Sequence, residues 1–416
     1  MKRLKLVMIG NGMAGVRTLE ELLKLAPALY DITVFGAEPH PNYNRILLSP
    51  VLAGEQDFAD IVLNDLAWYA EHGIRLQLGR KVLRIDRQKR QVLADDGSRA
   101  DYDRLLIATG SRPFILPIPG NQLEGVIGYR DIADTRCMLD SAERYRRAVV
   151  IGGGLLGLEA ANGLALRGMQ VSVVHNGASL LDRQLDARAS QLLQQALEHR
   201  GLQFILGKQT AQLLGNTDGR VSRVRFSDGD ELPADLVVMA AGIRPNIELA
   251  ADAGLPCARG IRVDDTLQSF DPRIYAVGEC ASHRGIAYGL VAPLFEQARV
   301  CASHLAQQGY RRYLGSLTST KLKVTGIDLF SAGDFAGGPG TQSVRLDDPI
   351  AGTYRKLVLK NDVLVGACLY GDTRDAGWYL ELIRHGSDVA GWRERLMFGQ
   401  ALCESQVSTH ALRGAA

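Results

Sequence analysis

The chain has 416 residues, which is enough for two to four domains and for more than one buried core. Its 48 Lys and Arg balance 46 Asp and Glu, and the net charge of +2 gives no general attraction to nucleic acid or to an anionic membrane. Hydrophobic residues make up 46% and charged residues 23%, which excludes a disordered or fibrous chain. Only glycine departs from the average: 45 glycines without a Gly-X-Y period predict specific tight turns.

The cysteines are widely spaced and form no C-x-x-C pair: Cys137, Cys257, Cys280, Cys301, Cys368 and Cys403. This spacing argues against a short-loop redox disulfide, a zinc ribbon and a ferredoxin-type cluster. We therefore expect reduced thiols, no metal and a cytoplasmic location. The basic and apolar start resembles a signal peptide, but cleavage there would destroy a glycine motif. The longest apolar stretch, Ala148 to Leu158, is too short to span a membrane.

The first part of the chain predicts a strand, a glycine turn, a helix and a second strand, in that order, at residues 4–9, 10–15, 16–25 and 31–35. The same order recurs at residues 147–151, 152–157, 158–166 and 170–174. Each half then continues with an Asp-Gly hairpin signal and a buried strand that ends in glycine, at Gly110 and Gly242. We therefore expect two homologous dinucleotide-type domains.

After Gly242, residues 274–280 predict one more strand and residues 293–308 a helix. From about residue 311 the pattern changes to short alternating runs, followed by a helical tail over residues 378–402. We predict an α/β fold with two Rossmann-like, glutathione-reductase-like dinucleotide domains and a C-terminal α+β domain. The predicted boundaries are 1–118 with 243–310 for the first domain, 119–242 for the second and 311–416 for the third.

Both glycine turns fit the G-x-G-x-x-G motif. The first holds Gly10, Gly12, Ala14 and Gly15, and the second holds Gly152, Gly154, Leu156 and Gly157. In this motif the first glycine makes a tight turn, the second lets a pyrophosphate approach the backbone, and the third lets the helix pack on the strand. A single copy is often an ordinary glycine-rich turn, but two copies in the same context predict two dinucleotide sites.

The chain resembles the two-dinucleotide-domain flavoprotein oxidoreductases, and within them the FAD-containing N-terminal part of assimilatory NAD(P)H-nitrite reductase large subunits. The strings that carry the resemblance are V-F-G-A-E-P-H-P-N-Y-N-R-I-L-L-S-P-V-L-A-G-E, G-G-G-L-L-G-L-E-A-A, K-L-K-V-T-G-I-D-L-F-S-A-G-D and W-Y-L-E-L-I-R. The resemblance spans essentially the whole chain and implies FAD in the first domain and NADH or NADPH in the second. In that family the chain continues into iron–sulfur and sirohaem segments, whereas this one stops and lacks cluster-type cysteines, so we do not expect nitrite reduction by this chain alone.

Glu38 lies 23 positions after Gly15, where an acidic residue accepts the ribose hydroxyls of the first nucleotide, although an ordinary surface charge is the alternative. The resemblance implies further FAD contacts at Arg45, Ser49, Val82, Thr109, Gly110, Arg130, Gly278, Glu279 and Gln297. For Val82 the alternative is a core strand residue, and for Arg45 an exposed ion pair. Cys280 has no partner cysteine nearby and is expected to be structural.

The second site lacks the acidic residue that binds the NADH ribose at the end of the second strand, because the sequence there is Val174-His175-Asn176. His175 is expected to tolerate a 2′-phosphate, so NADPH should at least be accepted; the alternative is a surface histidine. The resemblance places Glu159 at the nicotinamide and flavin as the catalytic-site residue, with a helix-dipole role as the alternative. Gly242 ends a strand of this half and is included in its nucleotide site.

We therefore predict an FAD-dependent NAD(P)H oxidoreductase that transfers hydride from the nicotinamide to the flavin and then electrons to an external acceptor protein. The resemblance implies nitrate or nitrite assimilation, with a nitrite or nitrate reductase component or a small iron carrier as partner, and neither nucleic acid nor a membrane. A rubredoxin- or ferredoxin-type reductase and a non-catalytic redox-sensing flavoprotein are the alternatives. Residues from 311 onward are expected to form a partner or homodimer surface, or to cover the flavin.

Overall fold

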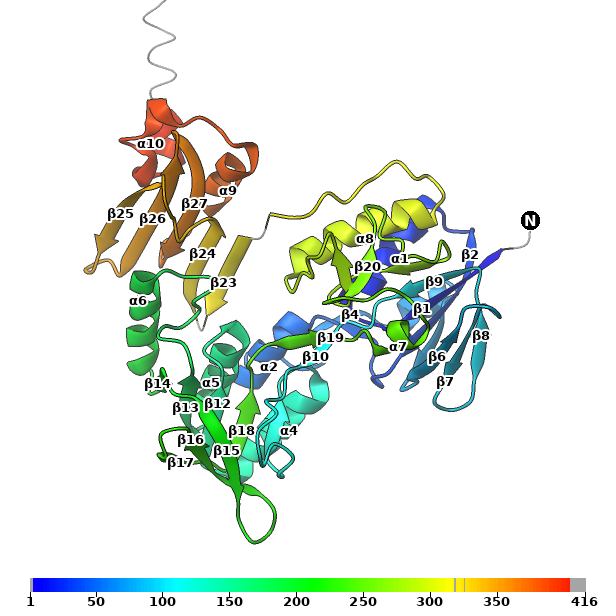
Figure 1. The fold of residues 1–416 in the computed structure, drawn as a ribbon, viewed down its shortest axis with the longest axis horizontal. Coiled ribbons are helices and arrows are strands. Elements are labelled where there is room, and N and C mark those ends of the chain that lie inside the picture. The colour runs from blue at the N-terminus through cyan, green and yellow to red at the C-terminus, as the bar shows by residue number, and fades with distance from the viewer. Residues whose placement is uncertain (1–2, 318, 325, 405–416) are drawn as a thin grey trace, which may run out of the picture. The chain divides into compact units, whose positions relative to one another are not determined.

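The computed structural model describes residues 3–317, 319–324 and 326–404, and for residues 322–324 only the backbone. These residues form two compact units (Figure 1). The first unit holds residues up to 114, 130–136 and 242–316, and the second holds 115–129, 137–241 and the residues from 317 onward.

A five-stranded parallel sheet forms the centre of the first unit, in the order β21-β9-β1-β2-β5. Its strands are β1 (Leu4–Ile9), β2 (Tyr30–Gly36), β5 (Arg75–Leu78), β9 (Arg104–Ile107) and β21 (Ile274–Ala276). Leu6 and Met8 of β1 belong to one hydrophobic cluster, whereas Val7 and Ile9 belong to another. Both faces of the sheet are therefore covered, which is why β1 is a continuous apolar run and not an alternating one.

Two helices pack together on the first unit's sheet, α1 (Met13–Leu25) and α8 (Val291–Leu305) (Figure 1). An antiparallel sheet packs on the opposite face, in the cluster that contains Val7 and Ile9; it is formed by β6 (Val82–Asp86), β7 (Gln91–Ala94) and β8 (Arg99–Asp101). The remaining elements are β3 (Asn42–Tyr43), η1 (Arg45–Leu47), α2 (Leu48–Ala53), β4 (Val62–Asn64), α3 (Leu66–Glu71), β10 (Ser111–Pro113), β19 (Ile243–Pro245), α7 (Glu248–Asp252), β20 (Ile261–Val263) and β22 (Ala281–His283).

The second unit repeats this plan with a parallel sheet in the order β11-β18-β12-β13-β14. Its strands are β11 (Val126–Gly128), β12 (Arg147–Ile151), β13 (Gln170–His175), β14 (Gln203–Leu206) and β18 (Leu236–Met239). Its helices are α5 (Leu155–Leu166) and α6 (Ala187–Glu198), while α4 (Ile132–Arg144) spans the boundary between the units. A second antiparallel sheet contains β15 (Thr210–Gly215), β16 (Val221–Phe226) and β17 (Glu231–Pro233). The predicted internal repeat is confirmed, including both Asp-Gly hairpins, whose Gly97 and Gly229 have φ of +82° and +94°.

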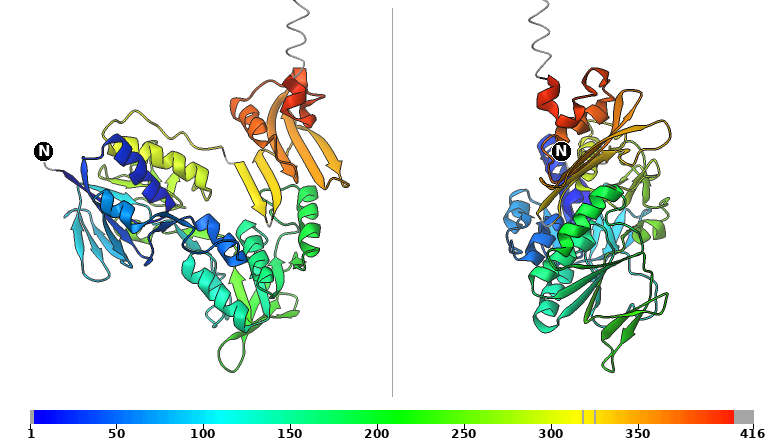
Figure 2. Two further views of the ribbon diagram at one scale, coloured as in Figure 1. Left: turned by 180° about the vertical axis from the view of Figure 1, so that it is seen from behind. Right: turned by 90° about the vertical axis from the view of Figure 1, so that its left-hand side faces the viewer.

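The C-terminal part is an antiparallel sheet with the order β23-β24-β27-β26-β25 and helix α9 packed on it (Figure 2). The strands are β23 (Ser319–Val324), β24 (Ile327–Gly333), β25 (Gln342–Asp348), β26 (Thr353–Lys360) and β27 (Val363–Tyr370). The predicted α/β fold with a C-terminal α+β part is therefore confirmed.

The single helical tail expected over residues 378–402 is wrong. Helix α9 (Ala376–His385) ends at Gly386, which has the left-handed φ of +59° and donates its N–H to carbonyl oxygens in the last turn. Three short elements follow: η2 (Ala390–Trp392), η3 (Leu396–Phe398) and α10 (Gln400–Glu404). Between α9 and η2 the chain returns to the sheet, because the backbone N–H of Val389 donates to the carbonyl of Asp362, in the turn between β26 and β27.

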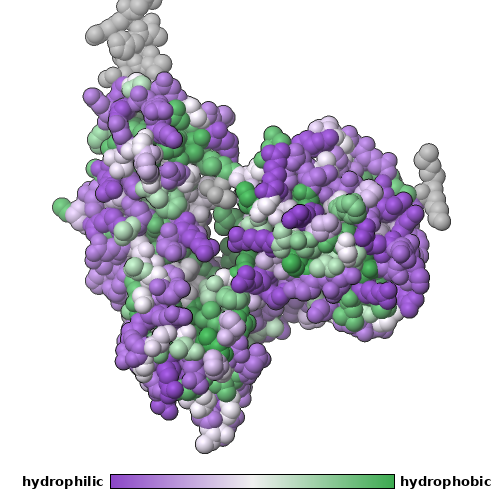
Figure 3. Space-filling view, viewed as in Figure 1, coloured by the Kyte–Doolittle hydropathy of each residue, from purple (hydrophilic) through white to green (hydrophobic). Residues whose placement is uncertain are grey.

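Hydrophilic residues cover most of the face seen in Figure 3. Within the described ranges, every helix is too short or too polar to cross a bilayer.

Candidate nucleotide-binding sites

The first glycine turn joins β1 to α1 and is held close to the loop after β9. Gly10 has φ of +102°, and a Cβ there would lie 2.2 Å from the carbonyl oxygen of Ala108. A Cβ on Gly15 would lie 2.9 Å from the Ala108 Cβ. At Gly12, in contrast, a Cβ would meet nothing within 4 Å. The first and third glycines thus serve packing, whereas the second leaves the backbone open to a ligand.

The start of α1 is suited to an anion. Its N-cap is Gly12, and no side chain caps the helix, so the first backbone N–H groups are available to a pyrophosphate. Gly278, with φ of +87°, closes on the same place, because a Cβ there would lie 3.0 Å from the Cβ of Ala14. The structure therefore brings these predicted residues together at one turn.

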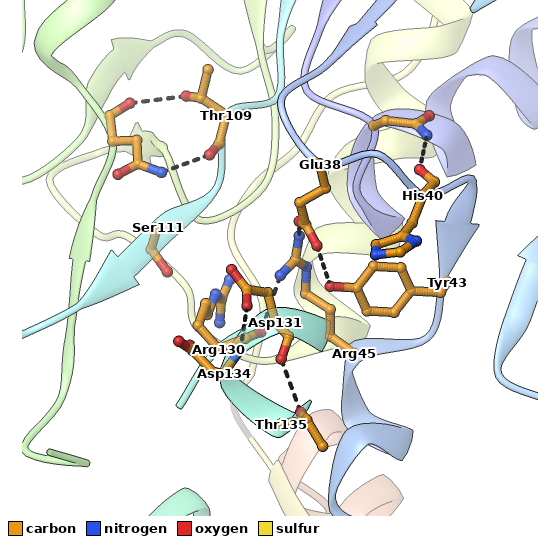
Figure 4. Close-up of polar contacts among 12 residues, drawn as sticks. Glu38, His40, Tyr43, Arg45, Thr109, Ser111, Arg130, Asp131, Asp134 and Thr135 are labelled. Carbon is orange, nitrogen blue, oxygen red and sulfur yellow. Dashed lines mark hydrogen bonds and ion pairs between the residues drawn. The ribbon is translucent and has the colours of Figure 1, made fainter. Parts of the chain in front are cut away.

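A polar cluster lies beyond the end of β2 (Figure 4). Glu38 forms an ion pair with Arg45 and accepts a hydrogen bond of 2.7 Å from the hydroxyl of Tyr43. Arg45 also donates to the backbone carbonyl of Arg130 at 3.0 Å. Burial disfavours the charged form of Arg45, but Tyr43 and Glu38 outweigh burial and raise its pKa. Sequence reasoning missed Tyr43, although it stands inside the string that carried the resemblance.

Arg130 and Glu279 form a second ion pair in the first unit. Ser111, which was not predicted, donates to Glu279 at 2.9 Å. A Cβ on Gly110 would lie 3.9 Å from Arg130 Nη2, so Gly110 borders this pair. The neighbouring Thr109 is engaged with a different partner: its hydroxyl donates to the carbonyl of Asn246, whose amide donates to the carbonyl of Thr109.

Several buried donors in the first unit have no hydrogen-bond partner among the described residues, and two of them, Arg130 Nε and Gln297 Nε2, belong to predicted FAD-binding residues. Gln297 is fully buried, and its Oε1 accepts the backbone N–H of Gly278 at 3.0 Å. Buried donors are normally satisfied, so this pair fits a polar ligand. Together with the open space above Gly12, these residues fit FAD.

The other predicted residues of the first unit are buried. Ser49 is 8% exposed on α2, and Val82 is 6% exposed at the start of β6, within a hydrophobic cluster. A backbone contact of Val82 with adenine therefore stays a prediction. Cys280 is fully buried and donates its S–H to the carbonyl of Val277 at 3.3 Å, and burial raises its pKa. An inert structural thiol fits these observations.

The second glycine turn has the same geometry as the first. Gly152 has φ of +133°, and a Cβ there would lie 2.4 Å from the carbonyl oxygen of Ala240. A Cβ on Gly157 would lie 2.0 Å from the carbonyl oxygen of Gly152, whereas a Cβ on Gly154 would meet nothing within 4 Å. Gly154 is also an N-cap without a side-chain cap, so α5 offers its N–H groups as α1 does.

His175 lies directly against this second turn. A Cβ on Gly153 would lie 2.9 Å from the His175 Cγ, and the imidazole Nε2 is buried without a partner among the described residues. Leu156 and Glu159 are half-buried on α5. Gly242 belongs to the first unit, and a Cβ there would meet nothing within 4 Å, so its place in this nucleotide site stays a prediction.

Comparison with known proteins agrees with this geometry. Residues 4–304 match the pyridine nucleotide-disulphide oxidoreductase family, and residues 319–387 match the rubredoxin NAD+ reductase C-terminal domain. Over 390 residues the chain is 51% identical to a nitrite reductase [NAD(P)H] of Bacillus subtilis, covering 94% of this chain and 48% of that protein. It is 49% identical to an assimilatory nitrate reductase electron transfer subunit of the same organism, over 94% of this chain and 50% of that protein. The chain thus spans about half the length of these relatives.

A solved structure of putidaredoxin reductase, covalently joined to putidaredoxin, matches with a TM-score of 0.83 and 27% identity over 93% of this chain and 94% of that one. A ferredoxin reductase from Rhodopseudomonas palustris matches with a TM-score of 0.82 and 25% identity, over 92% of this chain and 100% of that one. The resemblance inferred from the sequence is confirmed. The chain belongs to the pyridine nucleotide-disulphide oxidoreductase family, and it is an NAD(P)H-dependent flavoprotein oxidoreductase with FAD as its cofactor.

Proposed function

We propose that this chain is the NAD(P)H-oxidising electron-transfer component of nitrate or nitrite assimilation and that it passes electrons to a separate redox protein. The observation that carries the proposal is the presence of two glycine turns, each with open space above its second glycine. Its 49% identity with an assimilatory nitrate reductase electron transfer subunit supports the pathway.

Bound FAD would supply the redox chemistry, as hydride acceptor for the nicotinamide and electron donor for the acceptor protein. The protein's part is to bind and orient. The N–H groups at the starts of α1 and α5 would hold the two pyrophosphates, Glu38 would accept from the adenosine ribose, and Arg45 would face the pyrophosphate or flavin. Glu279 would accept from a ribityl hydroxyl, and Gln297 would donate its Nε2–H toward the flavin. Glu159 would lie near the nicotinamide and the flavin.

The proposal assigns FAD to residues 1–118 and 243–310 and NAD(P)H to residues 119–242. In this proposal the electrons would leave the flavin directly for the external acceptor protein. We further propose that residues 311–416 carry the surface for the partner protein or for a second copy, and that the protein acts in the cytoplasm.

The test uses the purified 416-residue polypeptide loaded with FAD. It should bleach when NAD(P)H is added without oxygen, and it should then reduce ferricyanide while leaving nitrite untouched. Adding extract from nitrate-grown cells should start nitrite consumption. Sustained nitrite consumption by the polypeptide alone would contradict the need for a partner, and failure to bind FAD would overturn the whole proposal.

A rubredoxin- or ferredoxin-type reductase is the second candidate. It is favoured by the match of residues 319–387 to the rubredoxin NAD+ reductase C-terminal domain. Faster turnover with rubredoxin or ferredoxin than with the nitrate-induced partner would select it. A protein that binds both nucleotides but fails to reduce any dye would instead be a redox sensor.

A further inference from the structure

The two nucleotide turns differ at one pair of equivalent positions. The first glycine of each turn donates its N–H to the second strand of its unit, Gly10 to Phe35 and Gly152 to Val174, both at 2.8 Å. The next residue along each turn is Asn11 in the first unit and Gly153 in the second, and the next residue along each strand is Gly36 and His175. Asn11 therefore corresponds to Gly153, and Gly36 corresponds to His175.

The large and small residues of this pair are exchanged between the units. In the first unit a Cβ on Gly36 would lie 3.0 Å from the Cβ of Asn11. In the second unit a Cβ on Gly153 would lie 2.9 Å from the Cγ of His175. The same space is thus filled from the turn in the first unit and from the strand in the second. In the first unit the side chain that fills this space belongs to the turn, at Asn11, so it can restrain the backbone of the turn. In the second unit it belongs to the strand, at His175.

That side chain is anchored to a separate helix. The Tyr69 hydroxyl on α3 donates to Asn11 Oδ1 at 2.7 Å, and the Asn11 amide donates to the carbonyl of His40 at 3.5 Å. Tyr69 is 2% exposed, and its ring lies in an edge-to-face arrangement with the ring of Trp68, at 5.0 Å between centroids. The Tyr69 hydroxyl therefore has a fixed position from which it restrains a residue lying between Gly10 and Gly12.

We propose that Asn11 and Tyr69 form a clamp that fixes the first glycine turn in its ligand-binding conformation and slows the release of FAD. The inference rests on the proposed placement of FAD at this turn. A resident cofactor gains from a preorganised binding loop because less ordering is needed when it binds. The nicotinamide nucleotide must leave after each turnover. Its turn has no side chain at Gly153 to form such a clamp and is held there by a backbone bond instead, from the Leu181 N–H to the Gly153 carbonyl at 3.0 Å.

The experiment measures the rate of FAD release from the full-length holoprotein after dilution, by the rise in flavin fluorescence. Tyr69→Phe removes only the hydroxyl and should speed release about fivefold, the loss expected for one hydrogen bond. The control is Tyr102→Phe, because Tyr102 is also buried, at 3% exposure, and its hydroxyl has no partner among the described residues. This control should release FAD at the wild-type rate.

A double-mutant cycle separates the clamp from general structural damage. Asn11→Gly makes the first turn like the second and should also speed release about fivefold. In the Asn11→Gly background, Tyr69→Phe should speed release much less than in the wild-type background, because only the hydroxyl's interaction with the Asn42 backbone is then lost. A purely structural tyrosine would act equally in both backgrounds. Wild-type release from Tyr69→Phe, or equal effects in both backgrounds, would overturn the clamp. A wild-type protein that never takes up FAD would instead overturn the proposed function.

Discussion

At the scale of single residues, the second glycine of the first turn separates ligand binding from folding. Gly12→Ala should fold as the wild type does, since the new methyl group meets no protein atom, but the methyl group should occupy the pyrophosphate position and weaken FAD binding at least about tenfold. Gly10→Ala should instead lower the free energy of unfolding by about 2 kcal/mol or more, through strain at positive φ and a clash with Ala108. Thermal unfolding of FAD-free protein and FAD titration measure the two effects. Equal FAD affinity in Gly12→Ala and wild type would contradict the placement.

Asp134, at the start of α4, gives a pH prediction. Burial, followed by the nearby Asp131 carboxylate, raises the pKa of Asp134 to about 6. Because the folded protein holds this proton more tightly than the unfolded chain, stability should fall as pH rises from about 4 to about 6. Asp134→Asn should remove this part of the pH dependence. Urea unfolding of FAD-free protein at several pH values measures it, with Asp140→Asn, an exposed residue of the same helix, as the control. An unchanged pH dependence in Asp134→Asn would contradict it.

The charged residues of the FAD site could be predicted because they stand in sequence strings tied to a glycine motif. Glu38 and Glu279 follow strand ends, and the structure pairs each with a predicted arginine. Tyr43 was missed although it stands in the same string as Glu38, five positions away, because a tyrosine carries no charge to single it out. Ser111 could not be found in this way, since folding brings it to Glu279 across 168 positions of sequence.

At the scale of elements, Asp186 joins the C-terminal sheet to α6 within the second unit. Its carboxylate accepts the Ala189 N–H at 3.0 Å as the N-cap of α6, and it accepts the Tyr354 hydroxyl of β26 at 2.7 Å. Lys356 Nζ lies 3.7 Å away, with its side chain only 5% exposed. Asp186→Ala should lower the free energy of unfolding by about 3 kcal/mol, because it removes a helix cap and leaves a buried ammonium without its counter-charge.

Urea unfolding measures this effect, and Asp347→Ala is the matched control. Asp347 pairs with Arg188 where both side chains are more than a third exposed, so its loss should leave the unfolding midpoint nearly unchanged. Equal decreases in the free energy of unfolding of Asp186→Ala and Asp347→Ala would contradict the stabilising role assigned to the buried contacts of Asp186.

Helices and strands whose apolar residues follow one regular spacing were predicted well, whereas the residues at which elements begin and end were predicted less well. Strand β12 begins and ends at the predicted residues, whereas α1 begins at Met13 and not at residue 16. Apolar spacing cannot reveal that start, because the first turn of α1 is set by the glycine N-cap. The single helical tail was predicted wrongly because apolar periodicity was followed past Gly386. This glycine ends α9 locally, through its left-handed conformation and its N–H bonds to the last turn.

At the scale of the whole molecule, nicotinamide choice should follow from the second turn. We expect NADPH to be accepted, since β13 ends at His175 without a carboxylate. His175→Glu should shift the ratio of kcat/KM values toward NADH about tenfold. His199→Glu, the same change at an exposed residue after α6, is the control. A wild type that already prefers NADH more than about 100-fold would mean that another residue binds the ribose.

The duplicated plan was visible in the sequence because motifs recur at matching offsets, but the grouping of the C-terminal sheet with the second unit was not. Tyr354 and Asp186 are 168 positions apart, and neither carries a motif. Contacts of this kind depend on how surfaces meet after folding, and no local pattern encodes them.

The exchanged packing at Asn11 and His175 restricts how either half of the molecule can evolve. An asparagine introduced at Gly153 would meet the imidazole of His175, and a histidine introduced at Gly36 would meet Asn11. Because each space holds one side chain, a single substitution cannot convert one arrangement into the other. Glycine at both positions would leave the space free for either side chain, so stepwise substitution from one arrangement to the other is easiest through a double-glycine intermediate.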